Sequence, residues 1–233
     1  MVRLTLGLAR VRWHGRRMRY PILFLPCLTF AACADPEIAA TPAQSEHDLF
    51  FAALASHCGE AYAGELVSTD EADADFRGAD MVMHVRECDE SEIRVPFHVQ
   101  RADGSWDRSR TWVFTRTDGG LRLKHDHRHD DGEPDAVTMY GGDTVDAGTA
   151  RSQGFPVDAE SIALFEREGL DASVTNVWTV EVDPAGSEDA EFAYQLQRTV
   201  AGGAPADRFF RVAFDLTRPV EPPPTPWGAA PPS

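Results

Sequence analysis

EIRVPFHV, residues 92–99, carries an apolar side chain at every second position. The apolar positions are Ile93, Val95, Phe97 and Val99. A period of two residues is typical of a β-strand that buries one face. The sequence ADGS at residues 102–105 predicts a hairpin turn directly after this strand. A second strand is then expected over residues 110–117, with Trp112 and Phe114 on one face.

The same alternation continues on both sides of this hairpin. It predicts further strands at residues 63–67, 81–86, 121–129, 174–182, 191–198 and 208–216. A helix is expected over residues 46–62, and the long connection 130–173 contains a second helix that starts at Asp158 and ends at Gly169. The predicted fold is mainly β: an antiparallel up-and-down β-barrel with an N-terminal helix. A two-sheet β-sandwich fits the same strand pattern.

A helix followed by a meander of strands resembles the lipocalin or calycin class in pattern over residues 46–216. The resemblance implies a barrel that binds a small, partly apolar ligand. Five aromatic residues are candidate walls of that ligand site, although each also suits an ordinary core: Trp112, Phe114, Trp178, Tyr194 and Phe210. Ligand cavities usually reach at least about 300 Å³, so a filled interior would instead indicate a structural accessory of the cell envelope.

The N-terminal region has the pattern of an export signal. Six arginines and no acidic residue precede an uncharged apolar stretch at residues 21–32. The sequence LTFAAC, residues 28–33, resembles the lipobox of bacterial lipoproteins. The resemblance implies that residues 1–32 are removed, that Cys33 carries acyl chains, and that the protein is anchored in the outer membrane facing the periplasm. Ordinary cleavage near residues 32–34, giving a free periplasmic protein, is the alternative.

Charge and composition indicate how the rest of the chain is organised. Residues 1–32 hold six of the 22 basic residues and none of the 38 acidic ones. Sixteen basic residues remain against 38 acidic ones, so residues 33–233 carry a net charge of −22. Such a domain should be repelled by nucleic acid, so its expected partners are the membrane, through the lipid anchor, and a small ligand. Residues 33–45 are expected to be a tether, residues 46–217 a single domain, and residues 218–233 a disordered proline-rich tail.

Two cysteines lie in the mature domain beyond the lipobox. In an oxidising periplasm, Cys58 and Cys88 are expected to form a disulfide, because export places the domain where disulfides persist. The alternative is a pair of buried thiols.

Three histidines at alternate positions are the most distinctive polar feature. His125, His127 and His129 share one face of the predicted strand 121–129, the face that also carries Leu121 and Leu123. Neighbouring histidines of this set lie about 6.6 Å apart at Cα, so one His-x-His pair could bind zinc or copper with a ligand from elsewhere. The competing function is therefore a metal-binding protein or metal-dependent enzyme. The alternative for the histidines is a hydrogen-bonded polar lining of the barrel.

Other catalytic patterns are missing from the sequence. It has neither a Gly-x-Ser-x-Gly nor a Ser-x-x-Lys nucleophile motif, and no Walker pattern. We therefore assign no catalytic residue and expect a non-catalytic protein. Four arginines, at positions 110, 116, 122 and 128, are expected to balance the charge of an acidic surface, and binding of an anion is the alternative.

Overall fold

The computed structural model describes residues 43–230, together with the isolated positions 12 and 15. Apart from positions 12 and 15, the predicted signal peptide lies outside the described residues, as do Cys33 and all but the last residues of the predicted tether. The helical elements are α1 (Glu46–Ala55), η1 (Glu71–Phe76), α2 (Ala159–Arg167), η2 (Asp171–Thr175) and η3 (Val200–Gly202). The strands are β1 (Ala61–Leu66), β2 (Met81–His84), β3 (Glu87–Cys88), β4 (Glu92–Gln100), β5 (Trp106–Thr117), β6 (Gly120–His127), β7 (Tyr140–Asp143), β8 (Ser152–Pro156), β9 (Val177–Val182), β10 (Glu191–Arg198) and β11 (Arg208–Val220).

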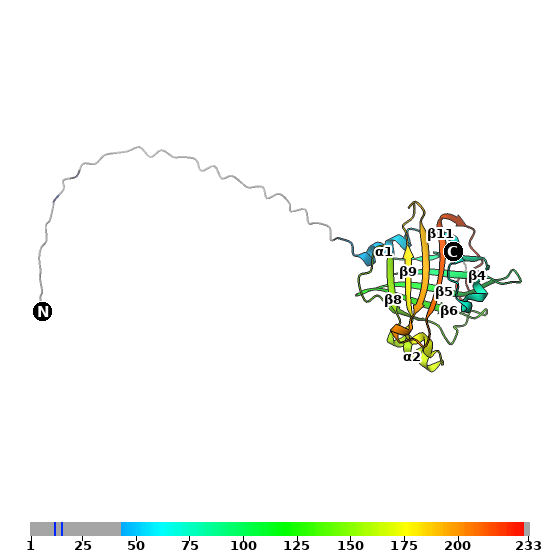
Figure 1. Cartoon of the computed structure of the whole chain (residues 1–233). Helices are drawn as coiled ribbons and strands as arrows, with labels where there is room; N and C mark the ends of the chain where they lie inside the picture. The colour runs from blue at the N-terminus through cyan, green and yellow to red at the C-terminus, as the bar shows by residue number, and fades with distance from the viewer. Residues whose placement is uncertain (1–11, 13–14, 16–42, 231–233) are drawn as a thin grey trace, which may run out of the picture. The chain divides into compact units, whose positions relative to one another are not determined.

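One antiparallel sheet contains all of these strands. Its order is β7-β6-β5-β4-β2-β1-β11-β10-β9-β8, with β3 paired to β4 beside this path. Figure 1 shows β9 and β11 passing in front of β4, β5 and β6 at a steep angle, as expected for a sheet that curls round on itself. The predicted up-and-down barrel is confirmed, and a single continuous sheet decides against the two-sheet sandwich.

The barrel is nearly closed where β7 approaches β8. The Asp158 backbone N–H donates to the Gly141 carbonyl oxygen at 2.9 Å. Gly142 leaves no room for a side chain, because a Cβ atom there would collide with the carbonyl oxygen of Pro156. The sequence pattern did not predict β7 or β8, since two glycines in the first and one in the second interrupt any apolar alternation.

Helix α1 closes one end of the barrel, and it is shorter than the predicted helix 46–62. Ser45 and Asp48 form a capping box at its start, and the helix ends at Ala55. Phe50 is fully buried, with its ring centroid 6.5 Å from that of Phe114 in β5. This packing fills the end of the barrel near the β5–β6 hairpin. In Figure 1, α1 and α2 lie at opposite ends of the sheet.

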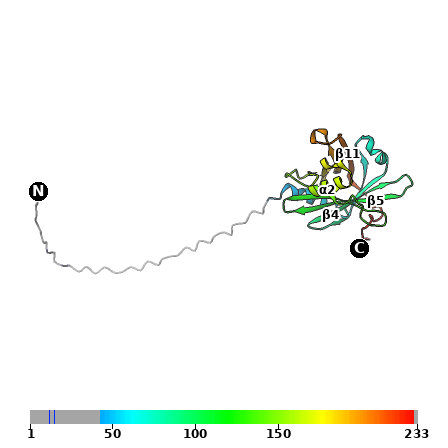
Figure 2. The same ribbon diagram turned by 90° about the horizontal axis from the view of Figure 1, so that it is seen from below.

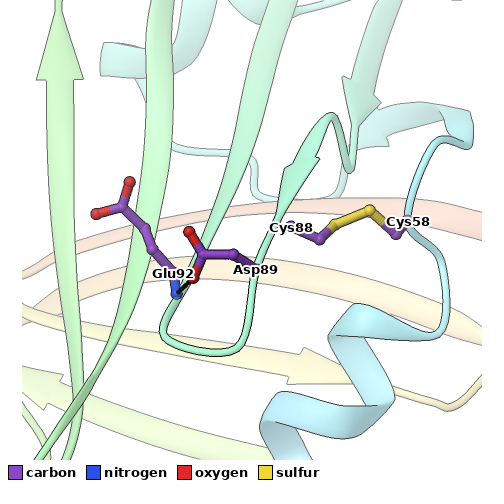
Figure 3. The surroundings of a disulfide bond; sticks show 4 residues. All are labelled: Cys58, Cys88, Asp89 and Glu92. Carbon is purple, nitrogen blue, oxygen red and sulfur yellow. Dashed lines mark hydrogen bonds between the residues drawn. A yellow bond between two sulfur atoms is a disulfide. The ribbon is translucent and has the colours of Figure 1, made fainter.

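The disulfide between Cys58 and Cys88 is confirmed, with a Cα–Cα distance of 6.2 Å. It links the segment after α1 to the short β3 hairpin (Figure 3). In that hairpin, the Glu92 backbone N–H donates to the Asp89 carboxylate at 2.7 Å. The covalent link therefore joins the closing helix to the wall of the barrel.

Residues up to 230 of the segment predicted to be a disordered tail are described, and several of them contact the outside of the barrel. Residues 218–220 continue β11. The Trp227 backbone N–H donates to the Arg108 carbonyl oxygen at 3.1 Å, and Arg108 Nη1 donates to the Thr225 carbonyl oxygen at 2.6 Å. The guanidinium groups of Arg101 and Arg108 also lie 5.4 and 5.8 Å from the centre of the Trp227 ring. These contacts hold the segment against the outer face of β5.

Candidate functional site

A pocket of about 180 Å³ lies at the end of the barrel opposite α1. We call it the mouth pocket, and it is lined by Phe76, Phe97, Arg110, Thr111, Trp112, His125, His127, Tyr140, Tyr194, Leu196, Arg208 and Phe210. In the view from below (Figure 2), α2 lies at this end of the barrel. The pocket is smaller than the cavity of about 300 Å³ expected for a lipocalin-like ligand site, so by that criterion the interior favours the structural-accessory role, and the pocket has room only for a smaller ligand.

Aromatic rings form one half of the mouth pocket. The rings of Trp112 and Tyr194 stack with centroids 4.6 Å apart, and Phe97 stacks on Trp112 at 5.0 Å. Phe76, from η1, packs its ring 5.1 Å from that of Phe210 in β11. Four strands and one short helix therefore bring these rings together, because the alternation along each strand turns its aromatic residues inward.

His127 and Tyr140 supply polar atoms to the same pocket. The Tyr140 hydroxyl lies 3.2 Å from His127 Nε2. Burial, followed by the nearby Arg110, lowers the pKa of His127 to about 4, so the imidazole is neutral at pH 7. Burial likewise raises the pKa of Tyr140 to about 12, and the phenol keeps its proton. The contact admits two tautomers: Nε2 accepts from the hydroxyl when the imidazole proton lies on Nδ1, and it donates to the hydroxyl when the proton lies on Nε2.

Arg110 stands at the entrance to the mouth pocket. It pairs with His127 in the register of β5 and β6. Its Nη1 donates to the Asp107 carboxylate at 2.6 Å, and its guanidinium lies 5.8 Å from the centre of the Phe76 ring. Arg110 lies two residues before Trp112 in β5, so both side chains are on the same face of the strand. Arg110 therefore faces inward instead of balancing the acidic surface.

Arg208 has a structural role beside the pocket. It binds the fully buried carboxylate of Asp73 and lies 3.2 Å from that of Asp70. The Ser68 hydroxyl donates to the same Asp73 carboxylate at 2.7 Å. These contacts fix η1 across the end of the barrel and so place Phe76 over the pocket.

A larger open cleft adjoins the mouth pocket. This outer cleft has a volume of about 790 Å³ and lies between residues 75–80, which include the end of η1, and the β4–β5 hairpin. It shares Phe76 and Arg110 with the mouth pocket. A ligand that enters from the cleft therefore passes these two side chains.

The three predicted metal-ligating histidines do not converge. Nδ1 of His125 lies 3.0 Å from the Tyr140 carbonyl oxygen and Nε2 lies 2.8 Å from the Tyr194 hydroxyl, so both ring nitrogens are already used. His127 interacts with the Tyr140 hydroxyl, and His129 is exposed near Asp135. Between residues 43 and 230, no group of three or more His, Cys, Asp or Glu side chains is arranged to hold a metal ion. The geometry matches the alternative of a hydrogen-bonded polar lining for His125 and His127.

The predicted ligand residues fall into two groups. Trp112, Tyr194 and Phe210 line the mouth pocket. Phe114 and Trp178 belong to the packed interior: Phe114 packs against the ring of Phe50 in α1, and the ring centroid of Trp178 lies 5.0 Å from that of His125. His125 and His127, predicted to face inward, also line the pocket. The sequence did not indicate Phe76 and Tyr140, since η1 and β7 were not predicted, and it assigned no ligand role to Phe97, Thr111, Leu196 and Arg208 on the predicted strands.

Comparisons of the chain with protein-family models, with curated proteins and with solved structures each found no match. The part of the chain that the structure describes contains no helix with the length and apolar character needed to cross a membrane.

Proposed function

We propose that this protein binds a small, partly apolar ligand in the mouth pocket and has no catalytic role. The observation that carries the proposal is an aromatic pocket at the open end of a barrel whose interior is otherwise filled by side chains. An apolar cavity of roughly 150 Å³ accommodates a molecule of the size of benzene. A pocket of about 180 Å³ therefore suits a single ring with one or two substituents.

A pocket-filling variant tests this proposal. Leu196 lines the pocket and is only partly buried, so Leu196→Trp should occupy the volume and leave the core intact. NMR titration with a panel of single-ring compounds should give chemical-shift changes at Trp112 and Tyr194 in the wild type and none in this variant. Val145→Trp, at an exposed position of the β7–β8 connection, is the matched control and should bind as the wild type does. A wild-type protein that binds no member of the panel would favour the structural-accessory role.

We also propose that the barrel is anchored to the outer membrane through lipid on Cys33. The support is the lipobox-like sequence at residues 28–33, which follows a basic region and an apolar stretch. Metabolic labelling with a palmitate analogue should mark the wild type, and Cys33→Ala should lose the label and leave the membrane fraction. An unlabelled wild-type protein would refute the anchor without affecting the pocket.

A further inference from the structure

The lining of the mouth pocket has an unusual charge for this chain. Two arginines and no acidic residue line it, although the sequence contains 38 acidic residues against 22 basic ones. Arginine beside a partly closed aromatic pocket favours a ligand that carries negative charge. The same electrostatic field disfavours a cation.

The hydrogen-bonding groups of the pocket also favour a ligand with negative charge, because they are donors. Among the described residues, the one hydrogen bond of the Arg110 guanidinium runs from Nη1 to Asp107, so Nε and Nη2 remain as donors. In the tautomer whose Nε2 accepts from the Tyr140 hydroxyl, His127 carries its proton on Nδ1 and offers it as a further donor. Arg110 and His127 are cross-strand partners, which places their donors side by side. A ligand group that meets them must accept hydrogen bonds.

Only one of the two arginines is available to a ligand. Arg208 is committed to Asp73 and Asp70, and it is largely buried. Among the described residues, Arg110 has a single acidic partner within 4 Å, Asp107, and about 30% of its side chain is exposed. Asp107 lines the outer cleft and is absent from the lining of the mouth pocket, so it holds Arg110 from the outer side.

Resting on the proposed function, we infer that the ligand is a single-ring aromatic carboxylate, with its ring among Trp112, Tyr194 and Phe210 and its carboxylate on Arg110. The carboxylate takes the guanidinium edge that Asp107 leaves free, and His127 Nδ1 donates a further hydrogen bond. Asp107 competes for the same guanidinium, so it lowers the affinity for the ligand. Substitutions at Arg110 and at Asp107 should therefore change the affinity for the carboxylate in opposite directions.

The test compares benzoate with benzyl alcohol, which has the same ring and no charge, by isothermal titration calorimetry on the intact protein. The wild type should bind benzoate at least tenfold more tightly than benzyl alcohol. Arg110→Gln should weaken benzoate binding roughly ten- to hundredfold and leave the affinity for benzyl alcohol within about twofold. Asp107→Asn should strengthen benzoate binding several-fold, which loss of folding could not produce.

Arg122→Gln is the matched control, because Arg122 forms a similar pair with Asp143 outside the pocket and should leave both affinities unchanged. Arg110→Lys, which keeps the charge, should retain part of the preference for benzoate. Equal benzoate affinity in the wild type and Arg110→Gln would overturn the inference, as would binding of benzyl alcohol without benzoate, and in both cases the proposed function stands. Binding of neither compound would overturn the inference and count against the proposed function as well.

Discussion

Replacement of each of two buried histidines by leucine should change the free energy of unfolding in opposite directions. His98 lies on β4 opposite Val82 of β2, and it is fully buried. Within the described residues neither of its ring nitrogens has a hydrogen-bond partner. His125 is equally buried, but both of its nitrogens are paired. We therefore expect His98→Leu to stabilise the protein and His125→Leu to destabilise it.

The magnitudes follow from the cost of unpaired polar groups. An unsatisfied buried polar group costs about 1–3 kcal/mol, and imperfect repacking around a new side chain costs less than about 1.5 kcal/mol. At pH 7.5, His98→Leu should raise the free energy of unfolding by about 1 kcal/mol. His125→Leu leaves the Tyr194 hydroxyl and the Tyr140 carbonyl oxygen without their partner, and it should lower this free energy by roughly 2–5 kcal/mol.

A lower pH should increase the difference in the free energy of unfolding between His98→Leu and the wild type. Burial, followed by the charges of His84 and Arg108, lowers the pKa of His98 to about 4, against 6.5 for the ordinary side chain. The unfolded chain therefore binds a proton below pH 6.5 that the folded protein accepts only near pH 4. The His98 contribution to stability is retained above pH 6.5 and is lost as the pH falls towards 4. Between pH 7.5 and 4.5 the wild type should lose about 2.5 kcal/mol relative to the variant.

Urea unfolding at these two pH values measures both effects. The difference between the wild type and His98→Leu at each pH isolates the contribution of His98, including its electrostatic interaction with His84. A variant that is less stable than the wild type at pH 7.5, with no change in the difference at pH 4.5, would refute the reasoning. It would mean that the His98 imidazole has a hydrogen-bonding partner.

Two further predictions concern the closure of the barrel. Cys58→Ala/Cys88→Ala should lower the free energy of unfolding by about 3.5 kcal/mol in urea titrations, because the disulfide closes a loop with a sequence separation of 30 residues; a loss below about 1 kcal/mol would contradict this. Gly142→Ala should lower it by about 1–3 kcal/mol, since the new methyl group meets the Pro156 carbonyl oxygen, whereas Gly154→Ala, with open space around its Cβ position, should stay within about 0.5 kcal/mol of the wild type.

The strands that alternate strictly could be predicted from the sequence, and those with glycine could not. β4, β10 and β11 each bury an alternating set of apolar side chains, which is the signal that a period of two detects. β7 consists of Tyr140, Gly141, Gly142 and Asp143, and its glycines are required by the close approach to β6 and β8. That requirement arises only when the barrel closes, so no local pattern reveals it.

The candidate site was harder to predict for a related reason. Its rings come from segments far apart in the sequence, as the Trp112–Tyr194 stack shows. Phe76 reaches the pocket only because Arg208 and the buried Asp73 fix η1 at the end of the barrel. Such a pairing depends on the completed sheet, and a single sequence does not indicate which strands will be neighbours.

Arg110 is a further residue of the site that local sequence could have identified, beside the predicted Trp112, Tyr194 and Phe210. It stands two positions before Trp112 and four before Phe114, so the alternation that turns these rings inward also turns Arg110 inward. A charged residue at such a position must find a partner or a ligand, because an unpaired charge in a barrel interior is costly. Asp107, three residues earlier, provides one partner at 2.6 Å from the outer side. The inner side of the guanidinium faces a pocket in which the described lining residues include aromatic rings and no carboxylate. The position of Arg110 therefore favours a negatively charged ligand in addition to the salt bridge with Asp107.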